Sequence, residues 1–359
     1  MLDQDQESLV VGGRYHLIRQ IGVGGTSRVY EAIHHLTQER VAIKVIPLQT
    51  VKSDTRTVAR FLREAKLSQE VTHDGIVKVL DAWIEKDERC CLVMELLNGV
   101  SLRAALRAGE VTRLQVTSWI SNILEALEVA HRAGVIHRDL KPENIFIHLP
   151  LREEKDTMIS SEQYYFDEDS GQMVLIKNND FDLNNTTSEV TEEQVIDHPQ
   201  DFYRCLNERS SDVQIKILDF GLSRTLMEPS ITQSGHFVGT PWYMSPEQVL
   251  SPKTCTSQTD LWSIGVLLYE ALCDGVPFQG ANLPAVCLSI SEDEVNLSNI
   301  NNIYPLAVDL CSCILRCLER DLSKRFRSAA TLKYDLDAEL EQFASCEISH
   351  DPIESQLYP

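Results

Sequence analysis

The chain has 359 residues, of which 43% are hydrophobic and 24% are charged, as in ordinary globular proteins. Its formal net charge of −21 argues against a nucleic-acid binder, which would hold phosphates with Lys and Arg, and against electrostatic attachment to a membrane surface. Ten cysteines follow no regular framework, and the first residues lack the apolar run of a signal peptide. No apolar run is long enough to span a bilayer, so we expect a cytoplasmic protein with reduced thiols.

The first hundred residues are expected to form a small sheet with one helix. Patterns rich in Val and Ile predict strands within 15–47, 76–83 and 90–95. Between them, residues 55–69 have an apolar stripe at helical spacing, made by Val58, Phe61, Leu62 and Ala65. The acidic segment before them, residues 1–13, is predicted to be a flexible N-terminus.

Helical periodicity dominates after residue 101, with apolar stripes in 119–130, 261–272 and 310–318. A β-rich first part and an α-rich second part predict two lobes. We place them at 14–97 and 98–345, followed by a C-terminal tail at 346–359.

Residues 150–213 are predicted to be an acidic, disordered insertion with one hairpin near 164–176. Between Leu151 and Gln214 there are 16 Asp and Glu but only 5 Lys and Arg. Connections longer than about 12–15 residues without structure are uncommon in compact domains. A passive solvated loop and a docking or regulatory segment, with Tyr164 and Tyr165 as phosphorylation targets, both remain open.

Residues 21–29 read Ile-Gly-Val-Gly-Gly-Thr-Ser-Arg-Val and fall between two predicted strands. Glycines let a backbone approach a ligand closely and direct N–H groups at phosphate oxygens. Taken alone, the pattern fits a flexible hairpin turn equally well. Because a strand follows it, it is not the strand-turn-helix motif of dinucleotide-binding proteins.

Lys44 ends the apolar strand Val-Ala-Ile-Lys, and Glu64 lies twenty residues later on the predicted helix. A lysine holds nucleotide phosphates only when its own side chain is positioned, and a carboxylate can do this. The alternatives are an exposed lysine and a glutamate on a solvated helix face beside Arg63 and Lys66.

Residues 137–144 read His-Arg-Asp-Leu-Lys-Pro-Glu-Asn and contain the side chains that phosphoryl transfer needs. This reaction requires a carboxylate that orients the attacking hydroxyl, oxygen ligands for Mg²⁺ and positive charge near the transferred group. The segment contains one residue for each requirement, in the same order: Asp139, Asn144 and Lys141. Asp219, in an Asp-Phe-Gly after an apolar strand, adds a second oxygen ligand for a hard cation.

Taken in order, these motifs resemble those of the eukaryotic-type (Hanks-type) serine/threonine protein kinase family, in a bacterial-like form. The resemblance covers residues 14–340 apart from the insertion, and it includes the Ser-Pro-Glu at 245–247. It implies an α+β, bilobal protein-kinase fold, with a small β-rich N-lobe carrying one helix and a larger α-helical C-lobe. It also implies transfer of the ATP γ-phosphate to Ser/Thr hydroxyls of proteins, including the enzyme itself, with Mg²⁺ or Mn²⁺.

The resemblance further implies roles for individual residues. Asp139 would be the catalytic base, with Lys141 beside it, while Asn144 and Asp219 would hold the metal. Lys44, paired with Glu64, would hold the ATP phosphates. The residues expected around the nucleotide are Ile21, Gly22, Val23, Gly24, Gly25, Ser27, Val29, Ala42, Lys44, Met94, Glu95, Leu97 and Phe146. Met94 would be the gatekeeper, and backbone groups of Glu95 and Leu97 would bond the adenine.

Outside the reacting groups, the resemblance implies three structural contacts. His137 and Phe220 would belong to an internal hydrophobic spine. Asp260 would anchor the 137–144 loop, and Glu247 would pair with Arg325.

Two features imply Ser/Thr rather than Tyr substrates. Lys141 stands where tyrosine kinases carry other residues, and residues 239–247 resemble the substrate-binding loop of serine/threonine kinases, in which Thr240 would bond Asp139 and Lys141. Arg138 would contact a phosphate on the 219–247 segment. The candidate autophosphorylation sites are Ser230, Thr232 and Ser234.

Two positions depart from the family pattern, since Ser27 replaces the third glycine of the loop and Ser245 replaces the alanine of Ala-Pro-Glu. Neither is a reacting group. The alternative function is a pseudokinase that binds nucleotide or partners without reaction. It is disfavoured because all five reacting side chains are present: Lys44, Glu64, Asp139, Asn144 and Asp219. Cys311, Cys313 and Cys317 are interpreted as core thiols rather than metal ligands.

Overall fold

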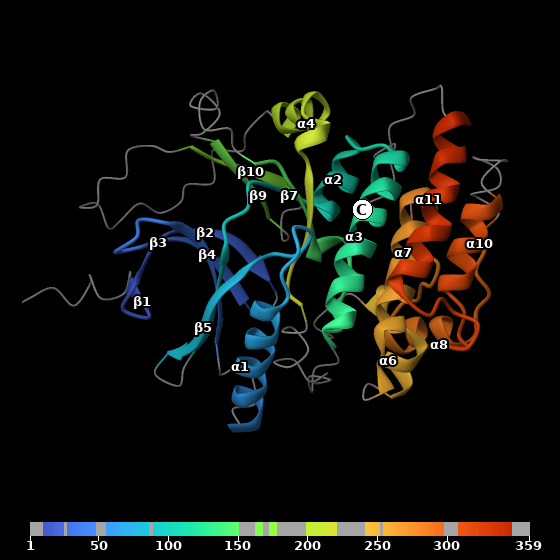
Figure 1. Ribbon diagram of the computed structural model, residues 1–359, viewed down its shortest axis with the longest axis horizontal. Coiled ribbons are helices and arrows are strands. Elements are labelled where there is room, and N and C mark those ends of the chain that lie inside the picture. Colours follow the sequence, from blue (N-terminus) through green and yellow to red (C-terminus); the bar gives the residue numbers. More distant parts are fainter. Residues whose placement is uncertain are drawn as a thin grey trace, which may run out of the picture. The chain divides into compact units, whose positions relative to one another are not determined.

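The computed structural model (Figure 1) describes residues 10–24, 27–47, 55–85, 89–150, 162–167, 172–177, 199–220, 241–251, 254–273, 275–297 and 308–346. The chain divides into two compact units. Unit 1 comprises Met1–Gln69, Lys78–Ala104 and Phe146–Gln214. Unit 2 comprises Glu70–Val77, Ala105–Ile145 and Ile215–Pro359.

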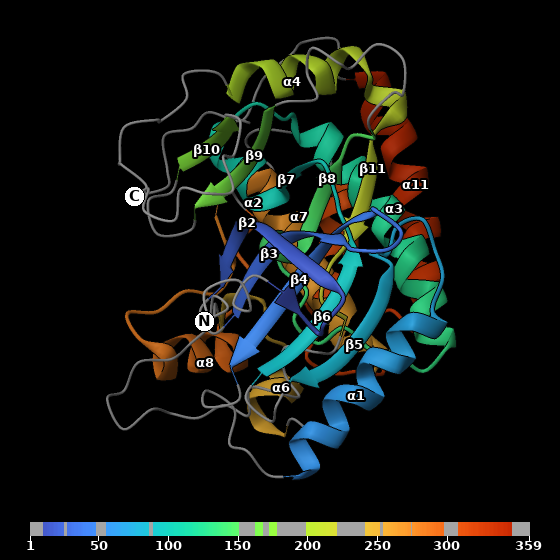
Figure 2. The same cartoon turned by 90° about the vertical axis from the view of Figure 1, so that its left-hand side faces the viewer.

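Unit 1 is built on a six-stranded antiparallel sheet with the order β1-β2-β3-β4-β6-β5 (Figure 2). Its strands are β1 (Val10–Val11), β2 (Tyr15–Gly24), β3 (Ser27–His34), β4 (Arg40–Pro47), β5 (Val79–Glu85) and β6 (Arg89–Glu95). Helix α1 (Thr55–Glu70) connects β4 to β5. This is the predicted sheet with one helix.

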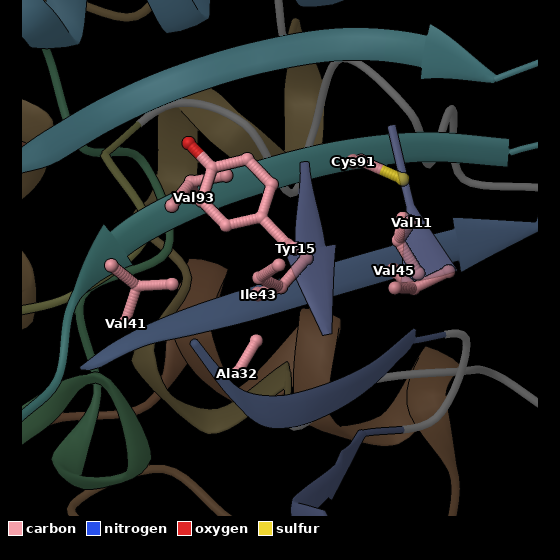
Figure 3. Packing of buried hydrophobic residues seen from close by; sticks show 8 residues of the cluster. All are labelled: Val11, Tyr15, Ala32, Val41, Ile43, Val45, Cys91 and Val93. Carbon is pink, nitrogen blue, oxygen red and sulfur yellow. The ribbon is translucent and has the colours of Figure 1, made fainter. Parts of the chain in front are cut away.

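One face of this sheet carries a hydrophobic core. Successive side chains of a strand point to opposite faces, so the core takes alternate residues. From β4 it takes Val41, Ile43 and Val45, which leaves Ala42 and Lys44 on the opposite face. The whole cluster, shown in Figure 3, consists of Val11, Tyr15, Ala32, Val41, Ile43, Val45, Cys91 and Val93.

The predicted flexible N-terminus is wrong for its last residues. Val10 and Val11 form β1 and pair with His16 and Tyr15, and Val11 is only 2% exposed. Gly12 follows with a φ of +59°, and a Cβ there would lie 2.5 Å from the Trp83 ring. The turn therefore folds β1 tightly onto the sheet, a tertiary contact that local composition did not reveal. Residues 1–9 lie outside the described part.

The predicted apolar stripe of α1 is confirmed for Phe61 and Ala65, which are buried, and wrong for Leu62, which is 39% exposed. At helical spacing from Phe61 and Ala65, the covered side continues with Glu64, which is half-buried, and Ser68, which is buried. Glu64 therefore does not share the solvated face of Arg63 and Lys66. The side chain of Val58 lies outside the described residues.

The predicted insertion contains more regular structure than expected. The hairpin is confirmed, since β9 (Glu162–Asp167) pairs antiparallel with β10 (Gln172–Lys177). Disorder is wrong for the end of the segment, where α4 (Pro199–Glu208) and a 3₁₀ turn (Ser210–Asp212) form. The acidic composition hid an amphipathic helix, whose buried residues are Phe202, Tyr203 and Leu206.

A short strand pair follows the sheet in unit 1. In it, β7 (Gly99–Ser101) pairs antiparallel with β8 (Ile145–His148), with Val100 opposite Ile147. The Asn98 side chain donates to the Leu149 carbonyl at 2.9 Å, and the Leu149 N–H returns a bond to the Asn98 carbonyl at 2.9 Å. These bonds keep β7 and β8 in unit 1, although both follow the predicted lobe boundary at 97.

Gly99 is required by a close backbone approach. Its φ is +151°, and a Cβ there would lie 1.9 Å from the Ile147 carbonyl oxygen. We expect Gly99→Ala to lower the free energy of unfolding by more than about 3 kcal/mol, because backbone must move. Urea unfolding followed by circular dichroism measures the loss. Gly13→Ala is the control, since Gly13 has a φ of +64° with nothing within 4 Å and should cost only about 1 kcal/mol. Equal losses would contradict the steric explanation.

Unit 2 is helical, which completes the predicted α+β fold. Its helices are α2 (Leu102–Ala108, begun in unit 1), α3 (Arg113–Arg132), α6 (Pro246–Leu250), α7 (Ser257–Cys273), α8 (Leu283–Glu292), α10 (Val308–Cys317) and α11 (Ala329–Cys346). Strand β11 (Gln214–Ile217) leads into it, and 3₁₀ turns lie at Pro142–Asn144 and Pro241–Tyr243. Helix α7 is buried over most of its length and packs against α3 and α10, and α11 covers α3 and α10 (Figure 1).

The three cysteines of α10 lie in this helical core. Cys311, Cys313 and Cys317 are buried, and burial raises the pKa of the Cys317 thiol well above its ordinary value. Within the described part of the chain, no group of three or more His, Cys, Asp or Glu side chains is arranged to hold a metal. No described helix is both long enough and apolar enough to cross a bilayer. The predicted tail beyond Cys346 lies outside the described residues.

Candidate active site

The 137–144 loop follows α3 and brings two of the predicted residues, Lys141 and Asn144, to the carboxylate of a third, Asp139. Lys141 Nζ lies 3.4 Å from Asp139 Oδ2. Asn144 Nδ2 donates to the same Oδ2 at 3.2 Å and to the Asp139 carbonyl at 2.7 Å. The Asp139 side chain is 35% exposed, so a reactant can reach the carboxylate. Because the Asn144 nitrogen faces Asp139, its amide oxygen is the atom left for a cation.

Asp260, at the start of α7, anchors this loop from the buried side, as predicted. Its carboxylate is 0% exposed and accepts the backbone N–H groups of His137 at 2.9 Å and Arg138 at 2.8 Å. It also accepts His131 Nε2–H at 2.7 Å. The anchoring is needed because Arg138 has a φ of +65°, which is unfavourable for a side-chain-bearing residue.

The 218–220 segment lies against the same loop, although some eighty residues separate them in sequence. The Leu218 N–H donates to the Asn144 carbonyl at 2.9 Å, and His137 Nε2–H donates to the Leu218 carbonyl at 2.7 Å. The Phe220 ring packs edge-on against His137 at a centroid distance of 4.9 Å, which confirms the predicted spine contact. Asp219, with a φ of +57°, therefore directly follows Leu218, which is bonded to Asn144.

The predicted nucleotide residues of unit 1 share one sheet face. Lys44 of β4 lies opposite Val29 of β3 and Leu92 of β6, and Ala42 lies opposite Met94 of β6. Directly opposed residues project to the same side of a sheet, so Val29, Ala42, Lys44 and Met94 project together. This face is the one opposite the hydrophobic core of Figure 3.

The glycine-rich segment forms the hairpin between β2 and β3. Gly22 pairs with Val29 and Gly24 with Ser27, and a register shift between Gln20 and Gly22 brings Ile21 and Val23 out of strict alternation. The Val23 side chain is 40% exposed. Gly25, at the tip of the predicted loop, lies outside the described residues.

Glu95, which follows Met94, bonds to Lys78 through both its backbone and its side chain. The Glu95 N–H is already bonded to the Lys78 carbonyl at 3.0 Å, and the Lys78 N–H donates to the Glu95 carboxylate at 2.9 Å. The Glu95 N–H thus has a partner within the protein, and the bonding of adenine by Glu95 and Leu97 stays a prediction. Leu97 and Phe146 are half-buried, the latter on β8.

Glu247 and Arg325 form the predicted buried ion pair. Arg325 is 1% exposed, and its two terminal nitrogens donate to the two carboxylate oxygens of Glu247 at 2.8 and 3.3 Å. Arg325 also donates to the carbonyls of Gln258 and Glu319, each at 2.9 Å. Burial raises the pKa of Glu247, but the hydrogen bond and charge of Arg325 outweigh it, so the pKa lies below its ordinary value.

Several predicted residues lie outside the described part, namely Thr240 and the three candidate phosphorylation sites Ser230, Thr232 and Ser234. Conversely, the structure adds His131 and Gln248, which sequence reasoning missed. His131 carries no motif of its own. Gln248 was signalled by the Ser-x-x-Gln pattern of a capping box, beginning at Ser245.

The protein kinase domain family matches residues 15–195 and 206–336 of the chain. The chain therefore belongs to the protein kinase family.

Its relatives among curated proteins include bacterial serine/threonine-protein kinases. It is 32% identical to pkn2 of Myxococcus xanthus over 332 residues, which cover 91% of this chain and 32% of that protein. It is 28% identical to PknL of Mycobacterium bovis, covering 94% of this chain and 68% of that protein. The bacterial-like form that the motifs implied is thus confirmed, and the chain spans about a third of the length of pkn2.

The fold agrees with a solved structure. Rad53 residues 1–466 in complex with AMP-PNP superpose with a TM-score of 0.58 over 89% of this chain and 64% of that one. At 22% sequence identity this likeness shows the fold alone.

Proposed function

We propose that this chain is a serine/threonine protein kinase that moves the γ-phosphate of ATP onto Ser or Thr hydroxyls of proteins. One observation supports this above the others. A partly exposed carboxylate, Asp139, has Lys141 Nζ at 3.4 Å and Asn144 Nδ2 at 3.2 Å, in a loop bonded to the 218–220 segment. The relatives named as serine/threonine-protein kinases support the same activity and substrate class.

In the proposed reaction Asp139 orients the substrate hydroxyl and accepts its proton. The hydroxyl oxygen forms a bond to the γ-phosphorus, and the bond from that phosphorus to the ADP oxygen breaks. The Lys141 ammonium lies beside the carboxylate, where it places positive charge next to the transferred group. Little covalent chemistry is required of the protein, so positioning and charge supply most of the rate.

The donor set fits a divalent metal. The carboxylate of Asp219 and the amide oxygen of Asn144 are hard oxygen ligands, which suit Mg²⁺ and also Mn²⁺. These two side chains would hold the ion together with phosphate oxygens and water. When bound, the ion would neutralise charge on the β- and γ-phosphates.

For the nucleotide, we propose that the sheet face with Val29, Ala42 and Lys44 binds ATP. The Lys44 ammonium would pair with the phosphates and with Glu64, whose half-buried position on α1 supports an inward role. The backbone of the β2–β3 hairpin would cover the phosphates. Adenine would be held among apolar side chains near Met94.

Further parts of the proposal concern the 219–247 segment and the site of action. Thr240 would contact Asp139 and Lys141, and autophosphorylation in this segment would bring a phosphate to Arg138. A kinase needs a supply of ATP, so we place its action in the cytoplasm. We propose proteins as substrates, and we propose no nucleic-acid or membrane partner.

The test is a transfer assay on the purified chain with γ-labelled ATP, Mg²⁺ and a degenerate peptide library. We expect label on Ser and Thr peptides, none on Tyr peptides, and loss of transfer when EDTA removes the metal. Nucleotide binding without any transfer, to peptides or to the chain itself, would support the pseudokinase alternative and overturn the proposal.

A further inference from the structure

Two segments that are far apart in sequence meet at the side chain of Gln248. This residue lies in the first turn of α6, directly after the Ser-Pro-Glu motif, and is only 5% exposed. Its amide oxygen accepts the Ser245 backbone N–H at 2.9 Å. Its amide nitrogen donates to the backbone carbonyl of Arg138, inside the 137–144 loop, at 2.7 Å.

The bond to Arg138 completes a clamp on the residue that precedes Asp139. The Arg138 N–H donates to the buried Asp260 carboxylate at 2.8 Å, and its carbonyl accepts from Gln248. Arg138 is thus held on both sides in a conformation with a φ of +65°. Such strained conformations persist only where the surrounding structure over-determines them.

The chemistry of the two partners specifies an amide at position 248. The side chain at this position must accept a hydrogen bond from one backbone N–H and donate another to a backbone carbonyl. Glutamate has no donor at neutral pH, and methionine of the same length offers neither group. The two partners also fix which end of the amide is oxygen and which is nitrogen.

We propose that Gln248 is a positioning residue for the reaction, because it fixes the Arg138 peptide and, through it, the Asp139 carboxylate. It thereby couples the end of the 219–247 segment to the proposed base. The inference rests on the proposed kinase activity, for which a base displaced by about 1 Å can cost a hundredfold in rate.

The test replaces Gln248 by Glu, which keeps the acceptor for Ser245 and loses the donor to Arg138. We expect kcat to fall about 10- to 100-fold, with KM for ATP within about twofold of the wild-type value. Gln248→Met, which loses both bonds, should lower kcat at least as much. Thermal unfolding is measured for each variant, and all rates are taken well below the transition.

Gln258→Glu is the matched control. The Gln258 amide also donates to backbone carbonyls in unit 2, those of Leu322 and Phe326 at 2.8 Å, but not in the 137–144 loop. We expect Gln258→Glu to be destabilised about as much as Gln248→Glu, while the kcat of Gln258→Glu stays near the wild-type value. If kcat of Gln248→Glu is unchanged, or falls no more than in the control, Gln248 is a structural residue and the proposal is overturned.

A second readout separates this inference from the proposed function. Hydrogen exchange of the amides of His137 and Arg138, both bonded to Asp260, should be faster in Gln248→Glu and unchanged in Gln258→Glu. An inactive wild-type chain would refute the kinase activity alone. Unchanged exchange in Gln248→Glu would refute the clamp, whatever the activity.

Discussion

Replacing Asp139 by Asn is expected to lower kcat for phosphate transfer by about a hundredfold to ten-thousandfold. The change removes the group that accepts the hydroxyl proton, and it also removes the negative charge that pairs with Lys141. The fold should persist, because Asn has the shape of Asp. In the wild type, Asn144 Nδ2 donates to the carboxylate at 3.2 Å, and the amide oxygen of the variant can still accept this bond. Initial rates with labelled ATP at saturating substrate measure the effect, and thermal unfolding verifies the fold.

A matched control for this variant is Asp335→Asn. Asp335 pairs with Arg316 at 3.1 Å on α11 and α10, and both side chains are more than 40% exposed. Exposed ion pairs contribute only about 0–1 kcal/mol, so rate and stability should stay near wild type. Full transfer by the Asp139 variant, with the control behaving as described, would contradict the assignment of the base.

The second large effect is expected at the buried ion pair. Arg325→Met should lower the free energy of unfolding by about 3–5 kcal/mol, because it leaves the Glu247 carboxylate buried without its partner. It also removes donors from the carbonyls of Gln258 and Glu319, and it removes the guanidinium stacked 5.1 Å over the Trp262 ring. Urea unfolding of the purified variant measures the loss. A variant within 1 kcal/mol of wild type, on the scale of an exposed pair, would show that the bidentate bond adds no stability.

The same pair makes a pH prediction with a definite sign. The folded-state pKa of Glu247 lies below its ordinary value, since Arg325 favours the ionised form against the effect of burial. The stability it contributes is therefore present above the unfolded-state pKa, about 4.3, and is lost as pH falls through the folded-state pKa. Between pH 7 and 3 the melting temperature of the wild type should fall more steeply than that of Glu247→Gln. Parallel curves would show that Glu247 does not contribute to the loss of stability at low pH.

Much of the proposed site was predictable because its groups are close in sequence. Asp139, Lys141 and Asn144 occupy one loop. Because only six residues span the three positions, their side chains lie close together in most conformations of the loop. Strand alternation likewise predicts that Ala42 and Lys44 face away from Val41 and Ile43, which the sheet confirms. The contacts of Asp260, and of Glu247 with Arg325, were expected from family resemblance alone.

The predictions from sequence were wrong where the surroundings of a segment, rather than its composition, decide whether the segment is buried or ordered. Leu62 has an apolar side chain at helical spacing, yet it is 39% exposed, while Phe61 and Ala65 of the same helix are buried. The acidic stretch before residue 213 ends in α4 because Phe202, Tyr203 and Leu206 find a surface to cover. Val11 is ordered because it can add a strand beside Tyr15.

Residue type and short spacing were enough to predict the family, the candidate reacting side chains and the order of strands and helices. The way in which the loop carrying Asp139 is held became visible only in the folded chain. Its anchors, His131, Gln248 and Asp260, come from three separate helices, and a hydrogen bond between residues more than a hundred positions apart has no local pattern. Burial makes those bonds necessary, because a polar group removed from water must find a partner wherever the fold places one.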